Sequence, residues 1–176
     1  MSEQEKYEKA TRDAGFEPFQ TISEHWGIYA LKDGSYLKLR ANVIKIGRAI
    51  DNFGNIAFNV NANTTIGIIP PRNLKGGPHP KPPTPQELVA SIVDDDVGLI
   101  TVEEEWSTYR LQDGTVLSIK LIPIKVSRTS IHDLNGEPLY NVDNQLLTKA
   151  SVPEELRRKG VHVQPQIPGK NPSFIT

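Results

Sequence analysis

Residues 26–48 read WGIYALKDGSYLKLRANVIKIGR, and residues 106–128 read WSTYRLQDGTVLSIKLIPIKVSR. Sliding the chain by 80 positions superposes the two stretches with nine identities in 23 positions, where typical residue frequencies give roughly one or two. Beyond Arg128 the match continues at a shift of 82, for example Asn59-Val60 with Asn141-Val142, so the second copy gains two residues in a loop. We interpret the chain as a tandem duplication, which decides the fold before any local feature does.

Each repeat begins with a predicted helix that has a capping box at its start. In the first repeat Ser2 and Glu5 form the box, and Gly15 marks the expected end of the helix. In the second repeat the box is Thr84 and Glu87, with a proline at the first helical position. The apolar side chains expected on the helix faces are Tyr7, Ala10 and Ala14 in the first helix and Leu88, Val89, Ile92 and Val93 in the second.

Three strands are predicted after each helix. Strand one spans 19–32 and 99–112, and an Asp-Gly pair then predicts a two-residue hairpin. Strand two changes its apolar phase at Ile44 and Ile124, with Pro123 beside the second change, which predicts a β-bulge or a sharp bend at both positions. Strand three contains Ile56, Phe58 and Val60 in the first repeat and Tyr140 and Val142 in the second.

The predicted fold class is α+β and mostly β, built from a duplicated helix-strand-strand-strand unit. Because a three-stranded sheet is marginal alone, we expect the two units to fuse about a pseudo-twofold axis into a six-stranded barrel or sandwich, flanked by the helices. The expected boundaries are 1–76 for the first repeat, 77–83 for a proline-rich linker, 84–163 for the second repeat and 164–176 for an extended tail, mobile at its end.

The composition excludes several classes of protein. The chain has 176 residues, a formal net charge of -1 and no cysteine, which rules out disulfide scaffolds, thiolate zinc sites and a cysteine nucleophile. There is no apolar run of membrane-spanning length and no signal-peptide pattern, so we expect a cytoplasmic protein. Nucleotide loops, metal-ligand spacings and catalytic motifs are missing, so no catalytic residue, cofactor or metal is predicted. Four histidines lie in four separate contexts, namely His25, His79, His132 and His162.

Four basic residues recur between the repeats and form the first candidate site. Lys45, Arg48, Lys125 and Arg128 are identical in pairs, and a pseudo-twofold axis would allow them to meet as an anion or partner site. The structural alternative is that each lysine is an exposed strand residue and each arginine pairs with an acid of its own repeat.

Two tryptophans recur in the same way. Trp26 and Trp106 are interpreted as packing anchors under the helices, with stacking on a base or another ligand as the alternative.

Charge is unevenly distributed along the chain. Residues 30–81 have a net charge of +6 and residues 82–109 a net charge of -7. The acidic block is a candidate for binding a cation or a basic partner, or for a solvated loop. Its two acidic clusters are Asp94, Asp95 and Asp96, and Glu103, Glu104 and Glu105.

These features favour a non-enzymatic binding or assembly protein, a duplicated β scaffold that docks a macromolecular partner, while an enzymatic role stays open. One alternative is an RNA- or ribosome-associated binder that uses a basic strand face, although the near-zero net charge argues against it. Another is a small-anion sensor or enzyme with its site on the pseudo-twofold axis. A protein partner is expected, nucleic acid and a homo-oligomer are kept as alternatives, and a membrane partner is not expected.

Overall fold

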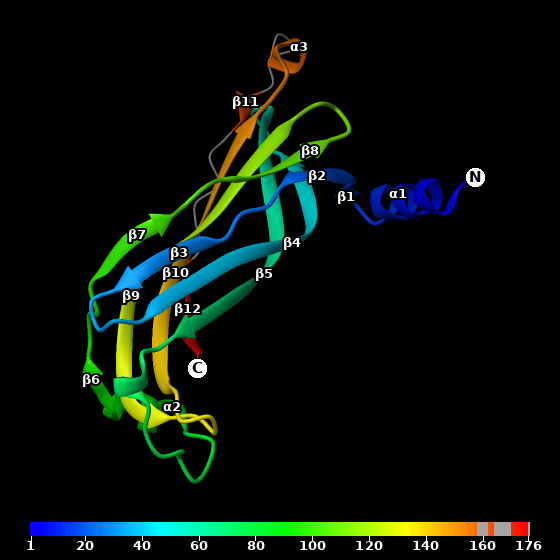
Figure 1. The fold of residues 1–176 in the computed structure, drawn as a ribbon. Helices are drawn as coiled ribbons and strands as arrows, with labels where there is room; N and C mark the ends of the chain where they lie inside the picture. Colours follow the sequence, from blue (N-terminus) through cyan, green and yellow to red (C-terminus); the bar gives the residue numbers. More distant parts are fainter. Residues whose placement is uncertain (158–161, 164–169, 176) are drawn as a thin grey trace.

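The computed structural model describes the backbone of residues 1–157, 162–163 and 170–175, and the side chains of residues 1–156. The protein is mostly β, with two sheets whose pairings are antiparallel apart from one short parallel pair, β11 with β5 (Figure 1). The first sheet has the order β11-β5-β4-β3-β7, with β1 also pairing with β4. The second has the order β12-β10-β9-β8-β2, with β6 also pairing with β9. The sequence predicts a six-stranded barrel or sandwich; within the described residues neither sheet closes into a barrel, and the strands form two sheets.

The first half of the chain contains α1 (Glu3–Asp13), β1 (Phe16–Glu17), β2 (Phe19–Ser23), β3 (Gly27–Leu31), β4 (Tyr36–Ile50), β5 (Asn55–Ile69) and a 3-10 turn η1 (Arg72–Leu74). The second half contains α2 (Pro85–Ala90), β6 (Ile92–Asp94), β7 (Leu99–Glu103), β8 (Ser107–Leu111), β9 (Val116–His132), β10 (Pro138–Ser151), α3 (Glu154–Arg157), β11 (His162–Val163) and β12 (Lys170–Ile175).

Each predicted long first strand is in fact two strands that belong to different sheets. The chain leaves the second sheet after β2, crosses at Glu24–Trp26, and enters the first sheet as β3. The other half crosses in the opposite sense, from β7 to β8, at Glu104–Trp106. Because β2 pairs with β8 and β3 pairs with β7, the two halves form one antiparallel ribbon that joins the sheets.

The predicted bulges are confirmed by the strand register. In the β4–β5 ladder the pairing skips Ile44, and in the β9–β10 ladder it skips Ile124. An extra residue turns all later side chains to the other face. The bulge thereby offsets the change in apolar phase, so Ile46 and Val126, which follow it, are buried in the core.

The Asp-Gly hairpins differ from the prediction by one residue. Leu31 N–H donates to the Ser35 carbonyl, and Leu111 N–H donates to that of Thr115, so each loop has three residues. Gly34 and Gly114 have φ of +92° and +90°, whereas among the described residues no residue other than glycine has a positive φ. A two-residue type I′ turn needs a positive φ at both central residues, and Asp33 and Asp113 do not supply it.

Both capping boxes are present, but the helices cover little of the sheets. No residue of α1 is buried, Tyr7 is 61% exposed, and the helix projects away from the sheets (Figure 1). The second helix is shorter than predicted because it ends at Ala90, where Ile92 begins β6 and pairs with β9. Only Leu88 of the predicted stripe is buried. None of the helices described here is long and apolar enough to cross a membrane.

One hydrophobic core contains residues of both sheets. Its most buried side chains include Tyr29, Leu37 and Leu39 of the first half and Tyr109, Leu117 and Ile119 of the second. The linker 77–83 is fixed to the second half near the β9–β10 turn, since His79 N–H donates to the His132 carbonyl. In the predicted tail, residues 170–175 are extended as β12 along β10, while 164–169 and 176 lie outside the described residues.

Candidate functional site

Polar side chains gather where the two halves cross between the sheets. The Tyr29 hydroxyl donates to the Glu104 carboxylate, and the Tyr109 hydroxyl donates to Glu24 Oε1 at 3.0 Å. Each tyrosine therefore bonds to the crossing segment of the other half. Lys120 Nζ donates to Glu104 at 2.9 Å, so that carboxylate is bound from both halves.

At this crossing, neutral phenols donate hydrogen bonds to carboxylates. Burial, followed by the bond to Glu104, raises the pKa of Tyr29 well above its ordinary value. The hydrogen bonds from Tyr29 and Lys120 lower the pKa of Glu104. The cavity between these groups has a volume of about 10 Å³, which is room for about one water molecule. The polar groups of the crossing are therefore hydrogen-bonded to one another and leave little room for a ligand.

Two arginine–aspartate contacts hold the Asp-Gly turns in place, and each joins the two halves of the chain. We call them the Arg48 clamp and the Arg128 clamp. Arg48 Nη2 donates to Asp113 Oδ2 at 2.5 Å, and Arg128 Nε lies 3.4 Å from Asp33 Oδ2. Arg48 also lies 3.4 Å from Glu17 of its own half. The expectation that each arginine pairs with an acid of its own repeat therefore holds for Arg48, which also pairs with Asp113, and is wrong for Arg128, because the ribbon brings each turn against the strands of the other half.

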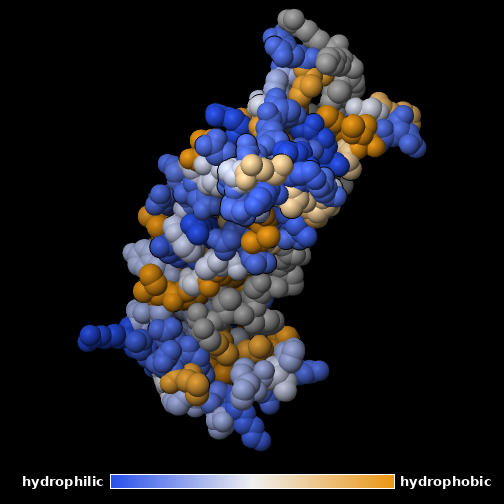
Figure 2. Space-filling view, turned by 90° about the vertical axis from the view of Figure 1, so that its right-hand side faces the viewer, coloured by the Kyte–Doolittle hydropathy of each residue, from blue (hydrophilic) through white to orange (hydrophobic). Residues whose placement is uncertain are grey.

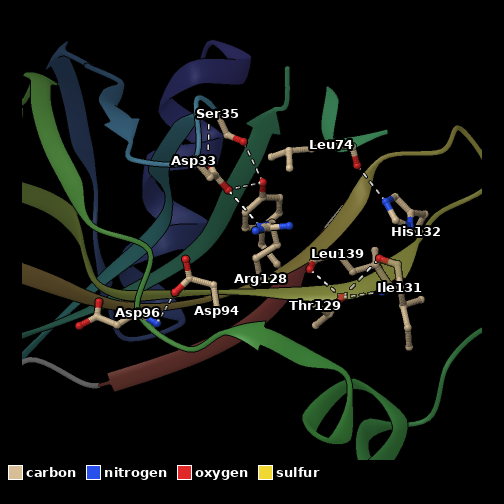
Figure 3. A network of polar contacts seen from close by, with 11 residues as sticks. Asp33, Ser35, Leu74, Asp94, Asp96, Arg128, Thr129, Ile131, His132 and Leu139 are labelled. Carbon is tan, nitrogen blue, oxygen red and sulfur yellow. Dashed lines mark hydrogen bonds and ion pairs between the residues drawn. The ribbon is translucent and has the colours of Figure 1, made fainter. Parts of the chain in front are cut away.

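The clamp around Arg128 is the more completely bonded of the two (Figure 3). The Tyr140 hydroxyl donates to Asp33 Oδ2 at 2.8 Å and lies 2.7 Å from Ser35 Oγ. Asp33 Oδ1 in turn accepts the Ser35 N–H. The buried charge of Asp33 is tolerated because this carboxylate is paired and hydrogen-bonded, whereas Arg128 Nε is buried and has an ion pair but no hydrogen bond.

The matching clamp around Arg48 lacks one hydroxyl. Phe58 lies opposite Arg48 in the β4–β5 ladder, as Tyr140 lies opposite Arg128 in the β9–β10 ladder. Without a phenol oxygen there, Thr115 Oγ1 is buried and has no hydrogen-bond partner. Burial opposes ionisation of Asp113, but hydrogen bonds from the Thr115 backbone N–H and from Arg48 outweigh it and hold the pKa of this carboxyl below its ordinary value.

The structure does not bring the four basic residues together. Leu111, beside the Asp113 turn, pairs with Phe19 at one end of the ribbon, whereas Leu31, beside the Asp33 turn, pairs with Leu99 at the other end. The two arginines therefore lie at opposite ends of the ribbon. Lys45 and Lys125 are exposed, and Lys45 Nζ lies 4.4 Å from the ring centroid of Phe16.

The acidic block is divided between structural and exposed residues. Glu104 belongs to the crossing, and Glu105 lies 3.2 Å from His25 Nδ1. Glu103 is exposed on β7, and Asp95 and Asp96 are exposed beyond β6. Asp94 is half-buried, and its Oδ1 accepts the Asp96 N–H (Figure 3).

The two tryptophans are half-buried beside lysine and arginine side chains rather than under the helices. Lys38 and Arg40 lie 4.4 and 4.8 Å from the ring centroid of Trp26. Lys120 and Lys149 lie 4.6 and 4.4 Å from that of Trp106. Cations over an indole ring are attracted by its quadrupole, so each tryptophan forms part of a basic surface cluster.

Comparison of the chain with protein-family models, curated proteins and solved structures found no match. The candidate site must therefore be judged on geometry. Among the side chains that the structure describes, no three histidine, aspartate or glutamate residues are placed to hold a metal ion.

The outer edge of β5 is the feature that best fits a docking role. From Ala57 to Ile69 the strand pairs with β4 on one side, and no described strand pairs with its other side. β12 lies near β5, but its ladder is formed with β10. Five residues of the middle of β5 are exposed, namely Asn59, Asn61, Asn63, Thr64 and Thr65. A row of backbone N–H and C=O groups along such an edge can pair with another chain.

Sequence reasoning missed this edge, although the sequence contains a signal for it. No charged residue occurs from Asn52 to Pro71. An edge strand is usually protected by lysine, proline or a charge pointing inward, and this 20-residue stretch places none of them within β5.

Proposed function

We propose that the protein is a non-enzymatic binding or assembly protein that docks an extended segment of a macromolecular partner along the outer edge of β5. The observation that carries the proposal is the outer edge of β5 from Ala57 to Ile69, which contains no charged residue and pairs with no strand among the described residues. A segment added there gains main-chain hydrogen bonds for affinity and side-chain contacts for specificity. The cytoplasm remains the location expected from the sequence.

Three other stretches of strand edge support this choice, because two are irregular and one is already paired. On β7 the ladder skips Val102, on β2 it skips Ile22, and such bulges twist an edge away from a partner. The outer side of β10 from Tyr140 to Gln145 is paired with β12. On the face that Figure 2 shows, hydrophobic side chains are scattered in small groups among hydrophilic ones.

We further infer that the scaffold arose by tandem duplication, with repeats at 1–76 and 84–163 joined by the 77–83 linker and related by a pseudo-twofold axis. The matched strand orders β3-β4-β5 and β8-β9-β10 support this inference. So do the skipped residues Ile44 and Ile124, which are 80 positions apart.

A displayed library of extended peptides, selected on the immobilised full chain, tests the docking edge. Selected peptides should slow amide hydrogen exchange in 57–69, because new ladder bonds protect the edge. Thr64→Lys should weaken their binding at least about tenfold, which corresponds to about 1.4 kcal/mol. Thr101→Lys is the matched control, since Thr101 is exposed on β7 at the other edge of the same sheet.

The proposal fails if selected peptides protect amides elsewhere and leave 57–69 unchanged. It also fails if the two lysine variants weaken binding equally, since the effect would then come from charge and not from the edge.

A second candidate function is RNA binding, and the basic clusters around the two tryptophans favour it. Arginine, lysine and aromatic side chains on one surface suit single-stranded nucleic acid. Binding of a uridine oligonucleotide should then fall steeply as salt rises and should weaken in Lys38→Ala. A chain that does not bind it at about 50 mM salt does not have this function. The small-anion alternative at the crossing has less support, given the 10 Å³ cavity.

A further inference from the structure

We infer that the segment that docks on β5 is β5 of a second copy of this chain, paired antiparallel about a twofold axis. The inference rests on the proposed docking edge and names its occupant. The interface would be isologous, so that each copy presents the same strand and the two first sheets become continuous across it.

The absence of charge on β5 is what suits the strand to pairing with itself. Across a twofold axis a residue near the centre meets the same residue of the other copy, and like charges directly opposite are destabilising. β5 has no charged residue, whereas β7 carries Glu103 and β10 carries Asp143 and Lys149. Of these three strands, only β5 avoids a meeting of like charges whatever the register of the pairing.

The exposed side chains of β5 are suited to cross-strand bonding. Asn59, Asn61 and Asn63 each offer a donor and an acceptor. With the axis at Asn61, that residue meets its own copy and Asn59 meets Asn63, so each pair can hydrogen-bond. Thr64 adds a β-branched side chain that favours strand structure. The whole chain has a net charge of only -1, so repulsion between two copies is small.

Self-pairing through β5 makes a different prediction from association through opposed charges. The segments 30–81 and 82–109 are oppositely charged, and a contact between them would weaken as salt rises, because the screening length is about 10 Å at 0.1 M and shorter above it. A dimer joined by an uncharged ladder should keep its dissociation constant over the same range.

Sedimentation of the full chain, over a range of concentration at low and high salt, tests the inference. The wild type should be a dimer in equilibrium with monomer, with a dissociation constant that salt does not change. Asn61→Lys should raise the dissociation constant at least about tenfold. Asn135→Lys is the matched control, because Asn135 is exposed in the β9–β10 turn away from β5, and it should behave as wild type.

Opposite charges at one position distinguish self-pairing from a folding defect. Asn61→Lys and Asn61→Asp should each dissociate alone and should associate when mixed, since lysine then meets aspartate across the axis. Circular dichroism of each variant checks that the fold is kept. If either variant is unfolded, the test is hydrogen exchange of 57–69 in the wild type. It is measured at protein concentrations above and below the dissociation constant, and self-pairing through β5 should slow exchange only above it.

Three results overturn the inference, and they differ in what they mean for the proposed function. A wild type that stays monomeric while selected peptides protect 57–69 means that the edge takes another partner. A monomer without peptide protection of β5 removes both. A dimer that Asn61→Lys leaves unchanged, or that salt dissociates, places the interface elsewhere.

Discussion

Replacing Tyr140 by phenylalanine removes one oxygen atom from the clamp around Arg128 and keeps the ring that fills the core. That oxygen lies 2.8 Å from Asp33 Oδ2 and 2.7 Å from Ser35 Oγ. The replacement therefore breaks two hydrogen bonds, one of them to a carboxylate, and leaves the hydroxyl of Ser35, a residue only 1% exposed, without this partner.

The expected loss of stability follows from these bonds. A neutral hydrogen bond contributes about 1 kcal/mol and one to a charged group about 1.5–3 kcal/mol, so Tyr140→Phe should lower the free energy of unfolding by about 3 kcal/mol. For a chain of this size that corresponds to a fall in Tm of roughly 6–12 °C. Phe58→Tyr should have the opposite sign, raising stability by about 1 kcal/mol, because its hydroxyl gives the buried Thr115 Oγ1 a partner.

Urea unfolding and calorimetry of both variants measure these changes, with Tyr36→Phe as the control. Tyr36 is 48% exposed, so loss of its hydroxyl should change the free energy of unfolding by less than about 0.5 kcal/mol. The reasoning is refuted if Tyr140→Phe is as mild as the control. It is also refuted if Phe58→Tyr destabilises as much as Tyr140→Phe, since the two clamps would then not differ by a missing hydroxyl.

Three further outcomes are expected. The folded-state pKa values of Glu104 and Asp113 are lowered from ordinary values of 4.5 and 3.8. Each ionised carboxylate therefore stabilises the fold at a pH above its ordinary value, and this stabilisation is lost as the pH falls through the folded-state pKa. The difference in Tm between Glu104→Gln and wild type should be largest near pH 7 and should shrink in acid. Gly114→Ala should cost about 1–2 kcal/mol in urea unfolding, because φ is +90° and the new Cβ lies 3.2 Å from Pro153 Cγ, whereas Gly67→Ala, with nothing within 4 Å, should cost less. Lys45→Ala with Lys125→Ala should leave the Tm nearly unchanged in calorimetry, since both lysines are exposed; a large fall would show that they have a structural role.

The sequence was sufficient for features that depend on local chemistry. The capping boxes at Ser2 and Thr84 follow from side-chain bonds to the first turn, and both are present. The bulges at Ile44 and Ile124 follow from a change in apolar phase, which any strand with one buried face must resolve. Both are properties of a few neighbouring residues.

Features that depend on the choice of partner were not predictable from the repeats. β3 pairs with β4 of its own half on one side and with β7 on the other. Because β3 and β8 have the same pattern, period-two alternation cannot tell which half supplies the strand on that second side. The same ambiguity concealed the pairing of Arg128 with Asp33. The proposed docking edge was missed for another reason: its signal is the lack of charged residues on β5, and the search of the sequence was for residues that are present.

The crossing of the two halves has a consequence for how the chain folds during synthesis. Its side-chain bonds join residues far apart in sequence, with separations of 75 for Tyr29–Glu104 and 85 for Tyr109–Glu24. Strands β2 and β3 therefore leave the ribosome long before β7 and β8 can cover them. Folding dominated by such distant contacts is slow, and the early half must wait with unpaired strands that are prone to aggregate. The rate of translation between Leu31 and Leu111 thus sets how long the nascent chain is exposed.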